Sequence, residues 1–295
     1  MMKKITLAIC AIFCLNVSFA QLKNVKHVVL IGFDGFGAYS FEKADIPNIR
    51  NVMANGSWSL HARSVLPSSS ADNWASMLMG AGTELHGYTE WDSKKPELPS
   101  QQLDQYNMFP SIFTLLKEQK PKAETGVIYE WGGIGYLFPH DAVSFSLHAE
   151  GDSNTLVKSI DYIKSKKPLF TFIHFSDIDG VGHSIGHGTP EYYQQVHKSD
   201  TYVGQIMQAL EEAGMRENTI VIISADHGGI NKGHGGKTLQ EVEIPWIIAG
   251  PGIKTNNEIK ESIVTYDTAA TIAHILGLKA PLVWTGRNVA AAFRK

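Results

Sequence analysis

The sequence predicts an α/β fold in which a mainly parallel central sheet is flanked by helices on both faces. Short apolar runs rich in β-branched residues indicate buried strands, and they cover 25–33, 125–129, 168–175, 219–224 and 244–249. Segments with helical spacing of apolar residues alternate with these runs and cover 46–54, 72–79, 110–118, 154–165, 190–213 and 269–276. Because parallel neighbours need crossover connections, this order favours helices on both sides of the sheet.

Residues 1–20 have the pattern of a secretory signal peptide. Lys3 and Lys4 precede an apolar run over 5–15, and small residues follow it near the expected cleavage point. The run is too short to span a bilayer, so we expect no membrane span after cleavage. We therefore expect a secreted or periplasmic protein. Lipid anchoring through Cys14 and an uncleaved anchor are the alternatives.

The composition of the remaining chain restricts its chemistry. Both cysteines, Cys10 and Cys14, lie in the leader, so the mature chain has no thiol for a disulfide or a metal site. The formal net charge of −3 becomes about −5 once the leader is removed, and no long basic run indicates specific nucleic-acid binding. Residues 21–295 suffice for a single catalytic domain, with the polar stretch over 84–108 as a long loop or small cap.

Acidic residues follow three of the predicted strands, and a histidine stands close to two of them. Asp34 comes after the first strand, Asp179 and His183 after the strand over 168–175, and Asp226 and His227 after the strand over 219–224. In open parallel sheets, ligands bind beyond the carboxyl ends of the strands. This convergence predicts a metal site at that edge of the sheet.

The residue types suit a divalent cation such as zinc, which accepts imidazole nitrogen and carboxylate oxygen. Asp226 and His227 supply two ligands from one tight turn, whereas Asp179 and His183, with two glycines between them, are expected to bind from a loop. His234 lies on a glycine-rich segment that can bring a third histidine to the site. Two metal ions about 4 Å apart can hold both the attacking and the leaving oxygen of a phosphoryl transfer.

Three consecutive serines, Ser68, Ser69 and Ser70, precede the helix predicted to end near Gly80. A helix N-terminus favours anions through its free N–H groups and its dipole. A metal ion would activate a hydroxyl placed there. The alternative is that the serines only cap the helix.

These residues resemble the alkaline phosphatase superfamily and, within it, the nucleotide pyrophosphatase/phosphodiesterase branch, from about Val28 to Asn288. In that branch, the nucleophile segment is Thr-Phe-Pro-Asn, with a glycine ten residues after the nucleophile. Here Ser70-Ala-Asp-Asn73 occupies the segment and Gly80 falls ten residues after Ser70. The resemblance therefore implies an alkaline phosphatase-like fold with Ser70 as the nucleophile.

The same resemblance implies two divalent metal ions, zinc before manganese. One would be held by Asp179, His183 and His234, and Asn73 would donate its amide N–H to a nonbridging phosphoryl oxygen. The second ion would be held by Asp34, Asp226, His227 and the Ser70 oxygen.

The implied activity is metal-dependent hydrolysis of small-molecule phosphate esters, of the phosphodiesterase or nucleotide pyrophosphatase type. Serine in place of threonine, and Ala71-Asp72 in place of Phe-Pro, leave a phosphomonoesterase with alkaline phosphatase activity as the alternative. A sulfatase is disfavoured because 68–74 contains no arginine, and a noncatalytic secreted binding module is a further alternative. The sequence leaves the oligomeric state open. Aromatic residues that would either stack a flat group or pack in the protein are Trp74, Tyr88, Trp91, Tyr129 and Trp131.

Overall fold

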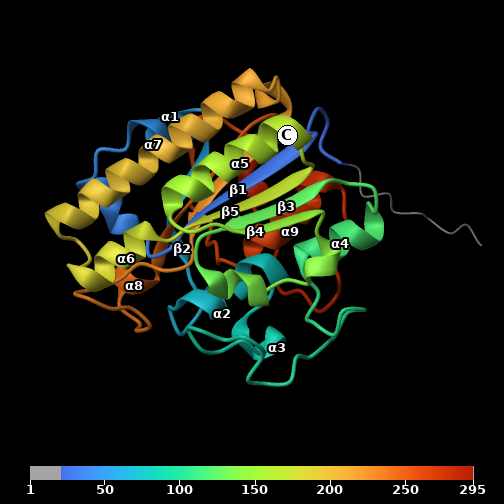
Figure 1. Ribbon diagram of the computed structural model, residues 1–295, viewed down its shortest axis with the longest axis horizontal. Helices are drawn as coiled ribbons and strands as arrows, with labels where there is room; N and C mark the ends of the chain where they lie inside the picture. Colours follow the sequence, from blue (N-terminus) through green and yellow to red (C-terminus); the bar gives the residue numbers. More distant parts are fainter. Residues whose placement is uncertain (1–20, 295) are drawn as a thin grey trace, which may run out of the picture.

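The computed structural model of the chain describes residues 21–294 (Figure 1). The leader predicted over 1–20, with both cysteines, lies outside the described residues. A single eight-stranded sheet runs through the described chain in the order β4-β3-β5-β1-β6-β7-β2-β8. The strands are β1 (His27–Phe33), β2 (Gly56–Arg63), β3 (Thr125–Tyr129), β4 (Phe145–His148), β5 (Phe170–Phe175), β6 (Thr219–Ala225), β7 (Glu243–Ala249) and β8 (Asn257–Glu258).

The sheet is parallel from β4 to β6, as predicted, and β7 is the one strand of the described chain that runs in the opposite direction. The connection from β6 to β7 carries only a four-residue helix, α8 (Leu239–Val242). A parallel neighbour needs a crossover that returns the chain to the other edge of the sheet. Because this connection stays at the carboxyl end of β6, β7 starts there and runs antiparallel to β6.

Helices cover both faces of the sheet, as predicted. In one layer α1, α5 and α6 contact α7, and in the other α2 contacts α3, α4 and α9 (Figure 1). The remaining helices are α1 (Pro47–Ala54), α2 (Ser70–Met79), α3 (Thr83–His86), α4 (Ile112–Gln119), α5 (Asp152–Lys166), α6 (Asp177–Ser184), α7 (Pro190–Glu212) and α9 (Asp267–Leu276).

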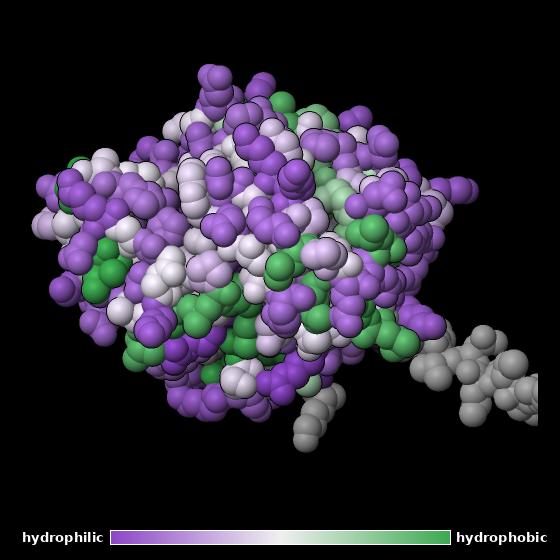
Figure 2. Space-filling view, turned by 90° about the horizontal axis from the view of Figure 1, so that it is seen from below, coloured by the Kyte–Doolittle hydropathy of each residue, from purple (hydrophilic) through white to green (hydrophobic). Residues whose placement is uncertain are grey.

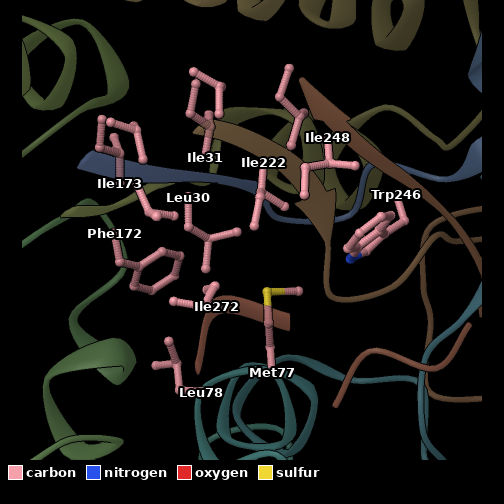
Figure 3. Close-up of a cluster of buried hydrophobic side chains, with 14 of the residues drawn as sticks. Leu30, Ile31, Met77, Leu78, Phe172, Ile173, Ile222, Trp246, Ile248 and Ile272 are labelled. Atoms are coloured by element: carbon pink, nitrogen blue, oxygen red, sulfur yellow. The ribbon is translucent and has the colours of Figure 1, made fainter. Parts of the chain in front are cut away.

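The hydrophobic core follows the alternation of side chains along the central strands. Figure 3 shows Leu30 and Phe172 pointing from the sheet towards Met77 of α2 and Ile272 of α9, whereas Ile31 points to the opposite side. All five side chains are fully buried. The strands with buried residues at every position therefore pack against both helical layers.

Two local predictions need correction. Asp179 and His183 do not lie on a loop but on α6, because Gly180 and Gly182 keep helical backbone angles despite their low helix propensity. No strand was predicted at β2, whose polar and aromatic residues break the apolar pattern, or at the short strands β4 and β8. The polar stretch over 84–108 contains the end of α3 and otherwise only turns and irregular backbone. Among residues 21–294, no helix is both long and apolar enough to span a bilayer.

Candidate metal centre

The predicted metal ligands meet at the carboxyl ends of the three central parallel strands. Asp34 directly follows β1, and Asp226 directly follows β6. Asp179 lies in the first turn of α6, two residues beyond the start of that helix, which itself follows β5. In the described chain, two groups of side chains bring ligand atoms within 4.8 Å of one another, and Asp179 belongs to both groups.

The first group consists of Asp179, His183 and His234. Helix α6 places Asp179 and His183 one turn apart on the same face, with 3.2 Å between Asp179 Oδ2 and His183 Nε2. The glycine-rich segment after β6 brings His234 Nε2 to 3.1 Å from His183 Nε2. These are the three residues that the sequence analysis assigned to one ion.

The hydrogen bonds of the two histidines in this group suit metal binding. His183 Nδ1–H donates to the carbonyl of Lys232 at 2.9 Å, and His234 Nδ1–H donates to the carbonyl of Ser68 at 3.1 Å. Both Nε2 atoms therefore lie together with the Asp179 carboxylate, whose hydrogen bond raises the pKa of His183 to about 9. Backbone carbonyls orient metal-binding histidines in this way, and a cation bound here would take the place of the proton on His183 Nε2.

The second group consists of Asp34, Asp179 and His227. His227 Nε2 lies 3.4 Å from Asp34 Oδ1 and 3.3 Å from Asp226 Oδ2. Its Nδ1–H donates to the carbonyl of Gly228 at 2.7 Å, which leaves Nε2 with a lone pair here too. Asp226 Oδ1 accepts hydrogen bonds from the backbone of Gly35 and His227, so only Oδ2 faces the centre.

Buried carboxylate oxygens without hydrogen-bond partners support the fit to cations. Asp34 Oδ1, Asp179 Oδ1 and Asp226 Oδ2 are buried and have no partner among the described residues. Burial raises the pKa of Asp226 well above its ordinary value, and the negative charges of Asp34 and Asp179 add to this shift. A buried cluster of carboxylates is costly unless a positive charge compensates it. Imidazole and carboxylate together form a donor set that zinc accepts.

Ser70 begins α2 beside this second group. Its Oγ lies 3.3 Å from His227 Nε2. The two preceding hydroxyls have other partners, since Ser68 Oγ donates to the carbonyl of Gly236 and Ser69 Oγ donates to Asp72 Oδ1. Of the three serines, Ser70 thus places its hydroxyl among the ligand-type residues. No side chain caps the start of α2, so the capping alternative finds no support in this geometry.

The Asn73 side chain, predicted to donate to a phosphoryl oxygen, is engaged by backbone groups in this structure. Its Nδ2 donates to the carbonyls of Ser69 at 2.9 Å and Pro67 at 3.0 Å, and its Oδ1 accepts from Val65 N–H at 2.7 Å. The side chain is fully buried. Because both of its N–H groups are engaged, the geometry gives Asn73 a role in holding the loop before Ser70.

His174 and Trp74 orient the Asp34 carboxylate, a contact that the sequence analysis missed. His174 Nε2 and Trp74 Nε1 each lie 3.2 Å from Asp34 Oδ2. Burial raises the pKa of Asp34, but the hydrogen bond and the charge of His174 outweigh it, so the pKa is lowered overall. The one signal for this contact was an ionisable side chain in the middle of the buried run of β5.

A pocket of about 570 Å³ opens next to the first group. The side chain of Trp91 is more than half exposed there, with 58% of its surface accessible. Figure 2 views the molecule from the side of α2 and α3 and shows apolar side chains gathered among hydrophilic ones. The lining residues are Pro67, Ser69, Glu90, Trp91, His183, His234 and Gly235.

The family model for type I phosphodiesterase / nucleotide pyrophosphatase matches residues 28–232 of the chain. This segment contains every strand end that carries a ligand-type residue. The chain belongs to this family. The resemblance to the nucleotide pyrophosphatase/phosphodiesterase branch is thereby confirmed.

Two relatives illustrate how distant the known members are. Human bis(5'-adenosyl)-triphosphatase ENPP4 is 24% identical over 213 residues, which cover 68% of this chain and 47% of the relative. Venom phosphodiesterase of Naja atra is 25% identical over 217 residues, which cover 68% of this chain and 26% of the relative. The chain thus spans half or less of the length of these two family members.

Solved structures confirm the fold. A murine ectonucleotide pyrophosphatase / phosphodiesterase 5, an inactive form in complex with AMP, superimposes with a TM-score of 0.73 over 87% of this chain and 96% of that chain, at 16% identity. A 2-O GAG sulfatase superimposes with a TM-score of 0.71 over 90% of this chain and 73% of that chain, at 18% identity. The alkaline phosphatase-like α/β architecture is therefore shared with both kinds of enzyme.

Proposed function

We propose that the protein is a secreted or periplasmic hydrolase of small-molecule phosphate esters, of the phosphodiesterase or nucleotide pyrophosphatase type. It would require two divalent metal ions, most readily zinc. The observation that carries the proposal is the position of the Ser70 hydroxyl, at the start of α2 and 3.3 Å from His227 Nε2. Membership in the family and the AMP complex of a structural neighbour support this substrate class.

Each side chain has a defined part in the proposed reaction. Asp179, His183 and His234 would hold one metal ion, and the other would be held by Asp34, Asp226, His227 and Ser70. Bound divalent cations neutralise the charge of the carboxylates and of the phosphoryl oxygens and favour ionisation of a nearby hydroxyl. The lining of the pocket by Trp91 supports a role in holding the remaining substituent of the ester.

The proposed chemistry consists of two displacements at phosphorus. Ser70 Oγ attacks phosphorus, the bond to the leaving alcohol or phosphate breaks, and the serine proton ends on the leaving oxygen. The intermediate is a phosphoserine ester that keeps the remaining substituent of the substrate. Water then attacks the phosphoserine, which releases the phosphoryl product and restores the hydroxyl. The positive end of the α2 dipole favours the negative charge on the phosphoryl group through both stages.

Hydrolysis of two model esters after zinc reconstitution tests the proposal. Bis-para-nitrophenyl phosphate reports on diesterase activity and para-nitrophenyl phosphate on monoesterase activity. We expect the diester to be turned over faster, and chelation by EDTA to abolish turnover. A strong preference for the monoester would replace the diesterase assignment with a phosphomonoesterase. No hydrolysis of either ester with zinc bound would instead favour a noncatalytic binding module.

A sulfatase activity is the competing enzymatic assignment within the same fold, since a sulfatase is among the structural neighbours. The segment that contains Ser70 lacks the arginine expected of that class. Para-nitrophenyl sulfate in the same assay distinguishes the two, and we expect no turnover of it.

A further inference from the structure

His187 lies beside the metal centre although it belongs to neither ligand group. It follows α6, and its backbone N–H donates to the carbonyl of Asn231 at 2.7 Å. Its side chain is fully buried, and its ring packs against Tyr192 with 5.3 Å between ring centroids. The imidazole is thus part of the protein interior between α6 and α7.

Two glycines make room for this ring. A Cβ atom on Gly182 of α6 would lie 2.4 Å from the imidazole of His187, and one on Gly229, after β6, would lie 2.3 Å from it. Both distances are far shorter than any real carbon contact. The two glycines, one on α6 and one after β6, therefore leave the space that the His187 ring fills. This space confines the ring next to Asp179.

The confined ring faces a carboxylate oxygen that has no other partner. His187 Nε2 lies 3.7 Å from Asp179 Oδ1, and both atoms are buried without a hydrogen bond in the described chain. The separation is longer than a hydrogen bond. A hydrogen bond between them therefore requires the carboxylate or the ring to move closer.

Tyr39 contacts the other ring nitrogen of His187. Its hydroxyl lies 3.4 Å from His187 Nδ1. Burial raises the pKa of Tyr39 above its ordinary value, with Tyr192 as the next cause, so its hydroxyl keeps its proton. If Tyr39 O–H donates to Nδ1, the ring proton is on Nε2 and points at Asp179 Oδ1.

We propose that His187 is a positioning residue for the metal centre: in the metal-loaded protein its Nε2–H donates to Asp179 Oδ1. Asp179 is the residue that both ligand groups share, and a hydrogen bond to Oδ1 would fix the plane of its carboxylate with Oδ2 beside His183. Partners of this kind around a ligand govern metal affinity. The inference rests on the proposed metal pair but not on the identity of the ester.

Zinc affinity, measured by competition with a chromophoric chelator, tests the proposal. His187→Leu removes the N–H at similar volume, whereas His187→Gln keeps an N–H group within reach of Asp179. Tyr39→Phe removes only the hydroxyl that directs the ring proton. We expect His187→Leu to weaken zinc binding by about 10- to 100-fold, His187→Gln to retain most of the affinity, and Tyr39→Phe to lie between them.

The visible spectrum of the cobalt-substituted protein gives a second measurement. We expect its bands to shift in His187→Leu and to return towards wild type in His187→Gln. Wild-type zinc affinity in His187→Leu would overturn the proposal, and so would an equal loss in the leucine and glutamine variants. Should His187→Leu fail to fold, unchanged zinc affinity in Tyr39→Phe would overturn it as well.

These measurements separate the inference from the proposed function. Zinc affinity and the cobalt spectrum do not depend on turnover. Wild-type protein that binds two zinc ions but hydrolyses no phosphate ester would refute the proposed function and leave the role of His187 standing. If chelation abolishes hydrolysis but His187→Leu binds zinc as tightly as wild type, the proposed function stands and the role of His187 is refuted.

Discussion

At the scale of single residues, histidines in this protein differ in function according to the partner of each ring nitrogen. His183, His227 and His234 use Nδ1 on backbone carbonyls and leave Nε2 free for the centre. His86 uses both nitrogens within the protein, since Nδ1 accepts from Tyr88 N–H at 3.1 Å and Nε2–H donates to Ser76 Oγ at 2.9 Å. The first pattern fits a ligand and the second a structural residue.

The buried His86 predicts a specific dependence of stability on pH. Burial lowers its pKa from 6.5 to about 3. The unfolded chain therefore takes up a proton as the pH falls below 6.5, while the folded protein does not, so stability present above pH 6.5 is lost towards pH 3. His86→Gln removes this group, and we expect a shallower fall in the free energy of unfolding below pH 6.5.

Urea unfolding of the metal-free protein at several pH values from 7.5 to 4.5 measures this slope. At neutral pH, His86→Gln should cost about 1–3 kcal/mol, because Tyr88 N–H loses its acceptor. The exposed His61 offers a matched control, and His61→Gln should leave the slope unchanged. An identical slope in wild type and His86→Gln would contradict the account.

At the scale of elements, α6 shows how packing decides the effect of a glycine. Gly180 and Gly182 lie in the same helix. A Cβ on Gly180 would have no neighbour within 4 Å, whereas one on Gly182 would meet His187 at 2.4 Å. Alanine ordinarily stabilises a helix interior relative to glycine by about 1 kcal/mol.

We therefore expect opposite results from two otherwise equal substitutions. Gly180→Ala should raise the free energy of unfolding by up to about 1 kcal/mol. Gly182→Ala should lower it by about 1–3 kcal/mol, because the ring has to move or the helix has to shift. Thermal and urea unfolding of the metal-free variants measure both effects. Stabilisation by both substitutions would show that the His187 ring does not pack against Gly182.

Elements with strong local patterns were predictable, and those fixed by tertiary contacts were not. A continuous apolar run such as that of β6 predicts a buried strand. The bounds of the predicted helices also lie close to the observed ones. β2 lacks the continuous apolar run by which the other strands were predicted; its residues alternate between apolar and polar types, which is the pattern of a half-buried strand, and it pairs with β7 and β8. The helical state of α6 was hidden by its two glycines, one of which serves the ring of His187.

The convergence of the ligand-type residues could be predicted because it follows from the topology of the sheet. Three parallel strands end at one edge of the sheet, so acidic residues after them converge wherever the loops are short. The orientation of individual side chains depends on contacts between distant segments. Asn73 illustrates this, because its side-chain amide donates to the carbonyl of Ser69 in the loop before Ser70. The spacing of residues in the sequence does not predict this hydrogen bond.

At the scale of the whole molecule, the reversal of β7 keeps the chain after β6 at the edge of the metal centre. This segment supplies His234 together with the Lys232 carbonyl that holds His183. Side chains that follow β1, β5 and β6 come together at this centre, so metal ions bound there would link segments that are far apart in the sequence. Metal content should therefore govern global stability as well as activity.

Removal of metal ions should lower the stability of the folded protein. A ligand that binds only the folded state stabilises it by about 2.7 kcal/mol per site at a concentration of about 100 times its Kd. We expect zinc to raise the melting temperature and EDTA to lower it, measured by calorimetry. A variant without the shared carboxylate, Asp179→Ala, should respond far less to zinc. Equal melting temperatures with zinc and with EDTA would contradict the proposed metal centre.

Turnover by Ser70→Ala with its metal ions bound tests whether Ser70 is the nucleophile. The matched control is Ser68→Ala, which removes a neighbouring hydroxyl that contacts the carbonyl of Gly236. We expect hydrolysis of bis-para-nitrophenyl phosphate to fall by at least about a thousandfold in Ser70→Ala and to stay near wild type in Ser68→Ala. Wild-type turnover by metal-loaded Ser70→Ala would show that another group is the nucleophile.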